Sequence, residues 1–333
     1  MSDYQQAKST IRKLYQDFDT APDADLIKVL TNYVSPEYHW RGMHPFDEIH
    51  GAENVIDTFW RPLKESFASL NRREDIFFAG YHHNDPNESV WVVSMGNFMG
   101  LFDKPWLGIR PTNRIIMIRY AEFHRVESKT ILETALFIDI LSVIQQAGQY
   151  PLGPMTGVHF VYPGPKTHDG ILLNSQDSEE GAKTIALVNK MVDDLSELNR
   201  TGEDRCPPEY LARTWNEDMI WYGPCGIGAS FTIERYQQQH QYPFRENLTD
   251  KVFNGHIARV SEGKYCGFFG WPNLNNRNMG GFMNLPASDV HAPMRVTDIY
   301  RREGDKLAEN WVFIDMLHYL NAQGLNVLDQ IKN

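Results

Sequence analysis

The chain has 333 residues, of which 42% are hydrophobic and 23% charged, and its net charge is −11. This length favours two domains of roughly 150 residues each, the acidic balance disfavours nucleic acid as a partner, and three scattered cysteines cannot form a disulfide framework. No stretch approaches the roughly 18 apolar residues of a membrane helix and the N-terminus lacks an apolar signal core, so we expect a cytoplasmic protein with no membrane partner.

Predicted elements follow one order in both parts of the chain. Each part begins with helices, continues through a short strand that carries a tryptophan and a further helix, and ends in strand-like runs and a terminal helix. Helices followed by a mostly antiparallel sheet are typical of an α+β fold. The ranges in chain order are 4–18, 23–33, 51–69, 75–84, 88–100, 113–126, 130–138 and 139–147 in the first part, and 178–199, 207–215, 229–242, 250–261, 264–271, 291–302, 306–314 and 315–323 in the second.

Residues 106–148 align without a gap onto residues 282–324, at an offset of 176 residues. An earlier match between Trp40 and Trp221 has an offset of 181, and one length difference before residue 106 reconciles the two offsets. A period this long indicates two whole domains. The stretch between them is rich in Pro and Gly, which is typical of a linker. We therefore predict one domain over residues 1–150, a linker over 151–176 and a second domain over 177–333.

The first part contains Gly96-Asn97-Phe98, the turn 106–114 (WLGIRPTNR), a strand ending at Arg125, and then Glu133 and Asp139 before a helix that closes at Gly148. This pattern resembles the SnoaL-like polyketide cyclases, a branch of the nuclear-transport-factor-like superfamily. The second part keeps only the outline of the turn, in residues 282–289, but is similar in the rest. The resemblance implies two tandem cone-shaped domains, each a curved, mostly antiparallel sheet wrapped by helices around an apolar pocket.

The resemblance also implies a proton-transferring carboxylate. In the cyclases an aspartate before the last helix is the proposed acid/base, and that role falls here on Asp139 and Asp315. Because side chains alternate along a strand, the residues sharing a face with these aspartates are expected to line the pocket: Glu133, Phe137, Glu309, Trp311 and Phe313. An aspartate just before a helix is equally well explained as an N-cap, and that alternative stays open.

Two further pairs of polar residues are candidates. His124 could partner a carboxylate in catalysis, and Tyr300 stands at the equivalent place in the second part. The alternative for His124 is an outward-facing strand residue. Arg119 and Arg295 could bind a substrate carboxylate or enolate, but we favour structural ion pairs with the glutamates of the neighbouring strand.

Two residues at the first strand of each part could select the substrate: His39 and Trp40 in the first part, and Trp221 and Tyr222 in the second. For the two tryptophans the alternative is simple core packing. The spacing of His39, His44, His50 and His82-His83 matches no zinc template, so we predict no metal. No strand leads into a glycine-rich phosphate loop, and we predict no cofactor.

These features favour a cofactor-free acid/base enzyme of cyclase, isomerase or lyase type that acts on a small hydrophobic carbonyl compound. The alternatives are a non-catalytic small-molecule-binding or assembly module, and a hydrolase or dehydratase that activates water with the same carboxylate. The expected partner is a small molecule. The two domains are expected to pack as an intramolecular pseudo-dimer, with further homo-oligomerisation left open.

Overall fold

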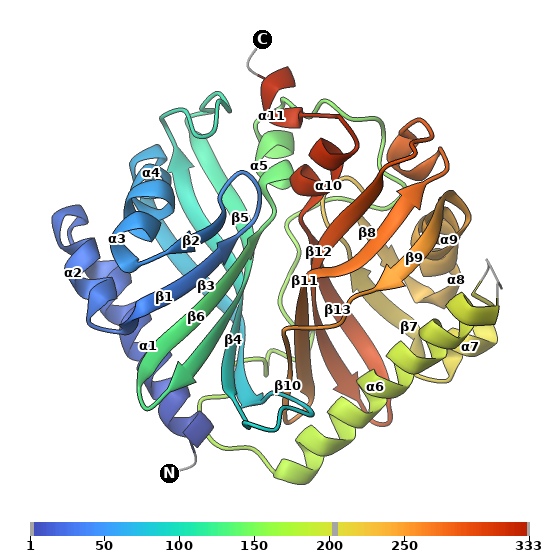
Figure 1. Ribbon diagram of the computed structural model, residues 1–333, viewed down its shortest axis with the longest axis horizontal. Helices are drawn as coiled ribbons and strands as arrows, with labels where there is room; N and C mark the ends of the chain where they lie inside the picture. Colours follow the sequence, from blue (N-terminus) through green and yellow to red (C-terminus); the bar gives the residue numbers. More distant parts are fainter. Residues whose placement is uncertain (1–2, 202–205, 332–333) are drawn as a thin grey trace. The chain divides into compact units, whose positions relative to one another are not determined.

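The computed structural model describes residues 3–201 and 206–331, which divide into two compact units. The first unit holds residues 3–150, 163–175 and the last helix, and the second holds 151–162 and the remainder up to residue 326. The elements of the first unit are, in chain order (Figure 1), α1 Asp3–Thr20, η1 Asp23–Asp25, α2 Leu26–Thr31, β1 Val34–Gly42, β2 Asp47–His50, α3 Ala52–Val55, η2 Ile56–Trp60, α4 Arg61–Ser66, β3 Phe67–Tyr81, β4 Val90–Phe102, β5 Arg114–Glu127, β6 Thr130–Ile138, α5 Ile140–Gln146 and, at the end of the chain, α11 Val327–Gln330.

The second unit repeats most of this order, without a counterpart of η1 or α11 among the described residues. Its third strand is split in two, and a short 3-10 helix follows its longest strand. The elements are α6 Ser178–Thr201, α7 Pro208–Ala212, β7 Trp215–Tyr222, β8 Ala229–Phe231, α8 Thr232–Tyr236, η3 Gln237–Gln241, α9 Tyr242–Asn247, β9 Leu248–Phe253, β10 Ala258–Glu262, β11 Tyr265–Asn278, η4 Phe282–Asn284, β12 His291–Glu303, β13 Lys306–Ile314 and α10 Met316–Ala322.

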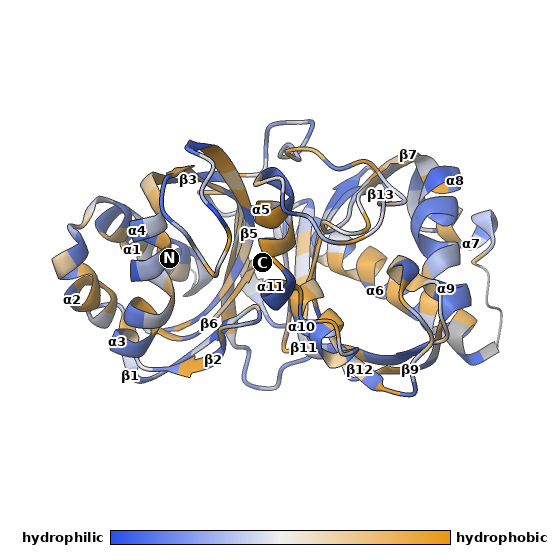
Figure 2. Ribbon diagram, turned by 90° about the horizontal axis from the view of Figure 1, so that it is seen from above, coloured by the Kyte–Doolittle hydropathy of each residue, from blue (hydrophilic) through white to orange (hydrophobic). Residues whose placement is uncertain are grey.

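Each unit contains one mixed sheet. The strand order is β2-β1-β6-β5-β4-β3 in the first sheet and β8-β7-β13-β12-β11-β10 in the second, where β9 also pairs with β11. Only β1 with β6 and β7 with β13 run parallel, and the other pairs are antiparallel. Figure 2 shows α1–α4 against one face of the first sheet and α6–α9 against one face of the second. The predicted α+β class, with curved sheets wrapped by helices, is confirmed. No helix in the described part of the chain is long and apolar enough to cross a membrane.

The helix that follows the final strand of each unit, α5 or α10, has the same kind of residue at its start and at its end. Asp139 caps α5, because its carboxylate accepts a hydrogen bond from the backbone N–H of Ser142 at 3.0 Å. At the other end Gly148 has a φ of +71°, which allows the backbone to turn back and bond the last carbonyls. Asp315 and Gly324, with a φ of +86°, bound α10 in the same way.

A π-helical turn precedes a proline in both units. Pro243 lacks a backbone N–H and its ring crowds the carbonyl of Gln239 four residues earlier, which disfavours a regular α-helical turn. The wider π turn η3 stands there, and the released Gln239 carbonyl accepts a hydrogen bond from Thr156 Oγ1 at 2.7 Å. Pro62 follows η2 in the first unit in the same manner. His240 lies within this π turn.

The Pro- and Gly-rich stretch between the two cones packs on both units in turn. Val158 forms a β-bridge with Ala229 at the edge of the second sheet. Further along, the backbone of Phe77 on β3 exchanges hydrogen bonds with Gly170 and Leu172, at 2.8 and 2.7 Å. Lys8 of α1 also donates to the Leu172 carbonyl at 2.8 Å. The stretch is therefore tied to ordered backbone on each unit.

Candidate active site

A cavity of about 220 Å³ lies inside the second unit, between the concave face of its sheet and the helices α6, α8, η3 and α9. Its wall is mostly apolar, and the polar groups that reach it come from β11, β12, β13, the loop between β9 and β10, and the helical side. A concave, mostly apolar space with a few polar groups is the usual form of a ligand site. The aromatic rings of the wall include those of Trp215, Trp221, Tyr236, Phe244, Phe268 and Tyr300.

Asp298 is the one carboxylate in the cavity wall among the described residues. Side chains alternate along β12, so Asp298 and Tyr300 face the cavity together, while the residue between them faces away. Tyr300 Oη donates to Asp298 Oδ1 at 3.0 Å, and Asn310 Nδ2 on β13 donates to the same oxygen at 3.2 Å. Oδ2 accepts no hydrogen bond from the described residues, so it is the oxygen left for a ligand.

Burial changes the acidity of this carboxyl group. Protein atoms surround Asp298, although the cavity leaves its side chain partly accessible. Burial disfavours the ionised form and raises the pKa of Asp298 from 3.8 to about 6, while the hydrogen bonds from Asn310 and Tyr300 oppose the rise. Asp298 is therefore mostly ionised at neutral pH but is a much stronger base than an exposed aspartate.

His240 adds a neutral ring to the same wall. Burial, with a contribution from Arg245, lowers the pKa of His240 to about 3, so its imidazole is uncharged at neutral pH. The ring is stacked on Trp221 with 4.1 Å between centroids. A neutral imidazole carries one N–H donor, which can stabilise a developing negative charge on a substrate oxygen.

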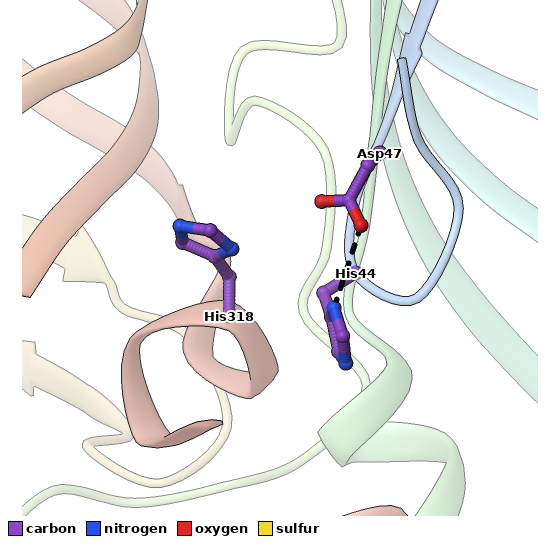
Figure 3. Close-up of side chains that lie close together, drawn as sticks. All are labelled: His44, Asp47 and His318. Carbon is purple, nitrogen blue, oxygen red and sulfur yellow. Dashed lines mark ion pairs between the residues drawn. The ribbon is translucent and has the colours of Figure 1, made fainter. Parts of the chain in front are cut away.

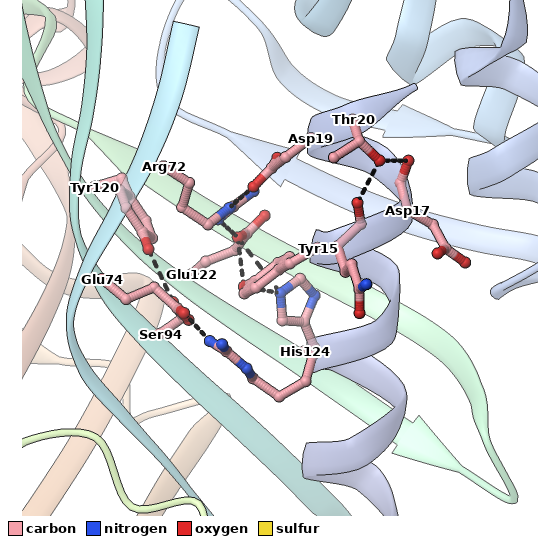
Figure 4. A network of polar contacts seen from close by, with 12 residues as sticks. Tyr15, Asp17, Asp19, Thr20, Arg72, Glu74, Ser94, Tyr120, Glu122 and His124 are labelled. Carbon is pink, nitrogen blue, oxygen red and sulfur yellow. Dashed lines mark hydrogen bonds and ion pairs between the residues drawn. The ribbon is translucent and has the colours of Figure 1, made fainter. Parts of the chain in front are cut away.

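The equivalent positions in the first unit hold a closed polar network (Figure 4). Glu122, 176 residues before Asp298, accepts hydrogen bonds from Tyr15 at 2.7 Å and from Arg72 at 2.8 Å. His124, at the place of Tyr300, contacts Tyr15 through Nε2 and Thr134 through Nδ1, both at 2.8 Å. His124 is 2% exposed, so it faces inward rather than toward solvent.

Arg72 determines how this network differs from the one around Asp298. Burial opposes ionisation of Glu122, but the Arg72 guanidinium, followed by His124, lowers the pKa of Glu122 to about 2. Glu122 is therefore an ionised and fully partnered group. A polar groove of about 520 Å³ between α1 and β3 reaches Tyr15 and Arg72 from outside, but Glu122 and His124 do not line it. In the first unit, therefore, Arg72 lies between the groove and the buried carboxylate of Glu122.

The structure places the two aspartates singled out from the sequence at helix N-termini. Asp139 and Asp315 are both capping residues, 6% and 1% exposed. The guanidinium of Arg119 lies 3.4 Å from Asp139 Oδ2, and that of Arg295 lies 3.3 Å from Asp315 Oδ2. Asp315 does not line the cavity. The residues of the preceding strand, β13, that line it are Asn310, Val312 and Ile314.

The two glutamates of the last strands have other partners than expected. Glu133 accepts hydrogen bonds from Arg41 at 2.8 Å and from Arg125 at 2.7 Å. Glu309 is fully buried and pairs with Arg301. The ion pairs favoured from the sequence, Arg119 with Glu133 and Arg295 with Glu309, are therefore replaced by pairs with the capping aspartates.

The remaining candidates divide between cavity and core. Of the second unit, Trp221 and Tyr300 line the cavity, whereas Tyr222 stacks on Trp311 at 5.5 Å between ring centroids, away from it. Phe313 and Phe137 are core residues, each 1% exposed or less, and so is Trp40.

The histidines near β1 and β2 form local contacts within the first unit. His39 is half-buried, 2.8 Å from Glu48, and its ring stacks on His50 with 4.5 Å between centroids. His44 Nδ1 lies 3.6 Å from the carboxylate of Asp47 (Figure 3).

Sequence reasoning missed Asp298, Asn310 and His240. One signal was present: an acidic residue stands in the interior of a predicted strand in both halves, as Glu122 and Asp298, at the offset that aligns the strands. A charged residue at such a position must be paired or functional, because an isolated buried charge is costly. His240 gave no such signal, since its place depends on the π turn.

No family model matches the chain, and no curated protein matches it. Among solved structures, a protein named as a SnoaL-like polyketide cyclase from Jannaschia sp. CCS1 is 20% identical; the match covers 45% of this chain and 97% of that chain, with a TM-score of 0.36. An NTF2-like protein from Burkholderia thailandensis is also 20% identical, covering 43% and 96% with a TM-score of 0.32. IdmH from Streptomyces antibioticus, which is also named as a polyketide cyclase, is 16% identical, covering 42% and 96% with a TM-score of 0.34.

Proposed function

We propose that the second unit is a cofactor-free acid/base catalyst that acts on a small, uncharged carbonyl compound, with Asp298 as the proton carrier. The observation that supports this is the combination of one carboxylate with a pKa of about 6 and a cavity lined mostly by aromatic and other apolar side chains. A base whose pKa lies near the ambient pH combines sufficient ionisation with sufficient basicity. The cavity of about 220 Å³ limits the substrate to a small molecule.

The chemistry needs no second reagent. Oδ2 of ionised Asp298 takes a proton from the carbon next to the substrate carbonyl, the C–H bond breaks, and its electron pair moves onto the carbonyl oxygen. The neutral imidazole of His240 is one group in the wall that can donate to this oxygen. Return of the proton from Asp298 to another carbon gives an isomer. Attack of the enolate carbon on a second carbonyl of the same molecule, with the proton passing to the new alkoxide, gives a cyclised product.

Tyr300 and Asn310 hold the carboxylate in place for this step. Both donate to Oδ1, so the carboxyl plane is fixed while Oδ2 faces the substrate. Their donation also stabilises the ionised form, which prevents burial from raising the pKa further. Asn310 is itself held, because its Nδ2 also donates to the Ile299 carbonyl at 3.2 Å.

Deuterium exchange tests the proposal without knowledge of the natural substrate. Cyclohexanone and acetophenone in D₂O are incubated with the protein, and loss of the proton signal next to the carbonyl is followed by NMR. We expect exchange above the buffer rate in the native protein and a loss of roughly 100-fold or more in Asp298→Asn, the usual contribution of a positioned base.

Asp315→Asn is the matched control, because asparagine also caps helices and the residue lies outside the cavity. It should retain the exchange. Exchange that survives in Asp298→Asn but disappears in Asp315→Asn would move the chemistry to the capping aspartate.

A further inference from the structure

We infer that the cavity of the second unit also binds a small organic cation, an ammonium or guanidinium compound, with its charge against Asp298 and its apolar part among the aromatic rings. The inference rests on the cavity of the proposed function but not on its catalytic step. Such a compound would compete with a carbonyl substrate, because both would contact Oδ2 of Asp298.

The first unit shows how this cone holds a cation. The Arg72 guanidinium is bonded to Glu122 at 2.8 Å. Its central carbon lies 3.7 Å from the centroid of the Tyr15 ring, 4.9 Å from that of Phe98 and 5.1 Å from that of Tyr120. A guanidinium among aromatic rings, beside a carboxylate, gains both cation–π and charge-assisted hydrogen-bond energy. The Arg72 side chain thus occupies, within the first unit, the kind of place that a bound cation would take.

The second unit lacks that arginine at the equivalent place. Arg72 on β3 pairs with Phe98 on β4, and Phe253 on β9 pairs with Leu274 on β11. Phe98 and Leu274 are 176 residues apart, as are Glu122 and Asp298. Phe253 thus stands where Arg72 stands in the first unit, and it lines the cavity with 49% of its surface exposed.

Asp298 therefore faces the cavity without a cation of its own. None of the described residues that line the cavity is a lysine or an arginine. Two arginines bind lining side chains from behind: Arg245 Nε donates to Gln241 at 3.1 Å, and Arg259 Nε donates to His256 at 3.1 Å. Among the described residues, Asp298 accepts hydrogen bonds only from neutral groups, Tyr300 and Asn310. A buried carboxylate without a countercharge favours a cationic ligand.

The wall suits the apolar part of such a ligand. Trp215, Trp221, Tyr236 and Phe268 present aromatic surface around the carboxylate. Their faces attract a cation, and tryptophan does so most strongly. The volume of about 220 Å³ admits a compound of the size of a benzyl group with a charged nitrogen. An acid of the same size would meet Asp298 with a like charge.

Three probes of similar size but different charge test the inference: benzylammonium, benzyl alcohol and benzoate. Binding is measured at pH 7.5 by calorimetry and by quenching of tryptophan fluorescence. We expect benzylammonium to bind at least tenfold more tightly than benzyl alcohol, and benzoate to bind more weakly than both. Equal affinities for benzylammonium and benzyl alcohol, or tighter binding of benzoate, would overturn the inference.

Two variants locate the binding. Asp298→Asn should reduce the preference for benzylammonium over benzyl alcohol to less than threefold, and an unchanged preference would overturn the inference. Phe253→Arg supplies the internal cation of the first unit, so it should abolish benzylammonium binding. Its folding is checked by circular dichroism, and Asp298→Asn provides the test independently if this second variant fails to fold.

The outcome separates the inference from the proposed function. Binding of benzylammonium without deuterium exchange on ketones would leave the cation site standing and remove the catalytic role. Exchange that benzylammonium does not inhibit would support the catalytic role and overturn the cation site.

Discussion

Tyr300 donates its hydroxyl proton to Asp298 at 3.0 Å, two residues back along the same strand, and both side chains face one cavity. In the first unit the equivalent carboxylate, Glu122, meets a guanidinium as well as a tyrosine. The neutral donor leaves Asp298 with a pKa of about 6, whereas the charged donor lowers the pKa of Glu122 to about 2. One cone thus contains a carboxylate that titrates near neutral pH, and the other contains one that stays ionised.

Replacing Asp298 should stabilise the protein at neutral pH. The folded-state pKa of about 6 lies above the ordinary 3.8, so ionisation of Asp298 costs up to about 3 kcal/mol of folding free energy above pH 6. This cost declines as pH falls from 6 to 4 and is absent below pH 4. Asp298→Asn should therefore raise the free energy of unfolding at pH 7.5 and leave it nearly unchanged at pH 4.

Urea denaturation at both pH values measures the effect. Asp305→Asn, a replacement of an exposed aspartate in a turn of the same unit, is the control and should show no such pH-dependent gain. An equal gain at pH 4 and pH 7.5 would contradict the assigned cost of ionisation.

Removing the tyrosine donor should raise the pKa of Asp298 above 6. The hydrogen bond from Tyr300 favours the ionised carboxylate, so Tyr300→Phe takes away a group that lowers its pKa. The titration curve of the Asp298 carboxyl carbon, followed by ¹³C NMR, should move to higher pH. Any deuterium exchange that depends on this base should show the same shift in its acidic limb.

Tyr222→Phe is the control for this shift. Tyr222 is a buried tyrosine of the same unit, but it stacks on Trp311 and does not line the cavity. The Asp298 titration should be unaltered in this variant. A curve that does not move in Tyr300→Phe would show that the hydrogen bond has no influence on acidity.

Loss of Arg72 should destabilise the first unit strongly. Arg72→Met leaves Glu122 buried without its cation, and an uncompensated buried charge typically costs roughly 3–5 kcal/mol. The double variant Arg72→Met with Glu122→Gln should recover much of the loss. A double-mutant cycle by chemical denaturation measures the coupling, and additive effects would contradict a direct ion pair.

The capping aspartates should contribute to stability in two separable ways. Asp315→Asn keeps the N-cap but loses the charge that pairs with Arg295, whereas Asp315→Ala loses both. We expect the alanine variant to be less stable than the asparagine variant by about 0.5–2 kcal/mol, the usual contribution of an N-cap. Thermal denaturation of the two variants gives the difference, and equal melting temperatures would argue against the cap.

Most of the architecture could be predicted because its signals are local. The strand predicted over residues 306–314 has those bounds in β13, and the predicted helix 139–147 differs from α5 by one residue at each end. The largest departure is in the third strand of each cone. β3 begins at Phe67, within the helix predicted over 51–69, because that helix ends at Ser66. In the second unit the corresponding stretch is divided into β9 and β10.

The site could not be predicted because the central strands are buried on both faces. On β13, Trp311 and Phe313 point one way and Val312 and Ile314 the other, and all four are less than 9% exposed. Alternation shows that Trp311 and Phe313 share a face, but with apolar residues on both sides it does not show which face is hollow. The even-numbered residues of β13, Asn310, Val312 and Ile314, line the cavity. Asp315 follows the strand and caps α10 instead.

The last helix has a consequence for how the protein is made. α11, Val327–Gln330, belongs to the first compact unit, although its residues leave the ribosome after the whole second unit has been synthesised. The first unit therefore has all of the parts described here only after the second unit has been translated. During synthesis its nascent form lacks the buried Val327 and Leu328, and the second cone emerges before the first is complete.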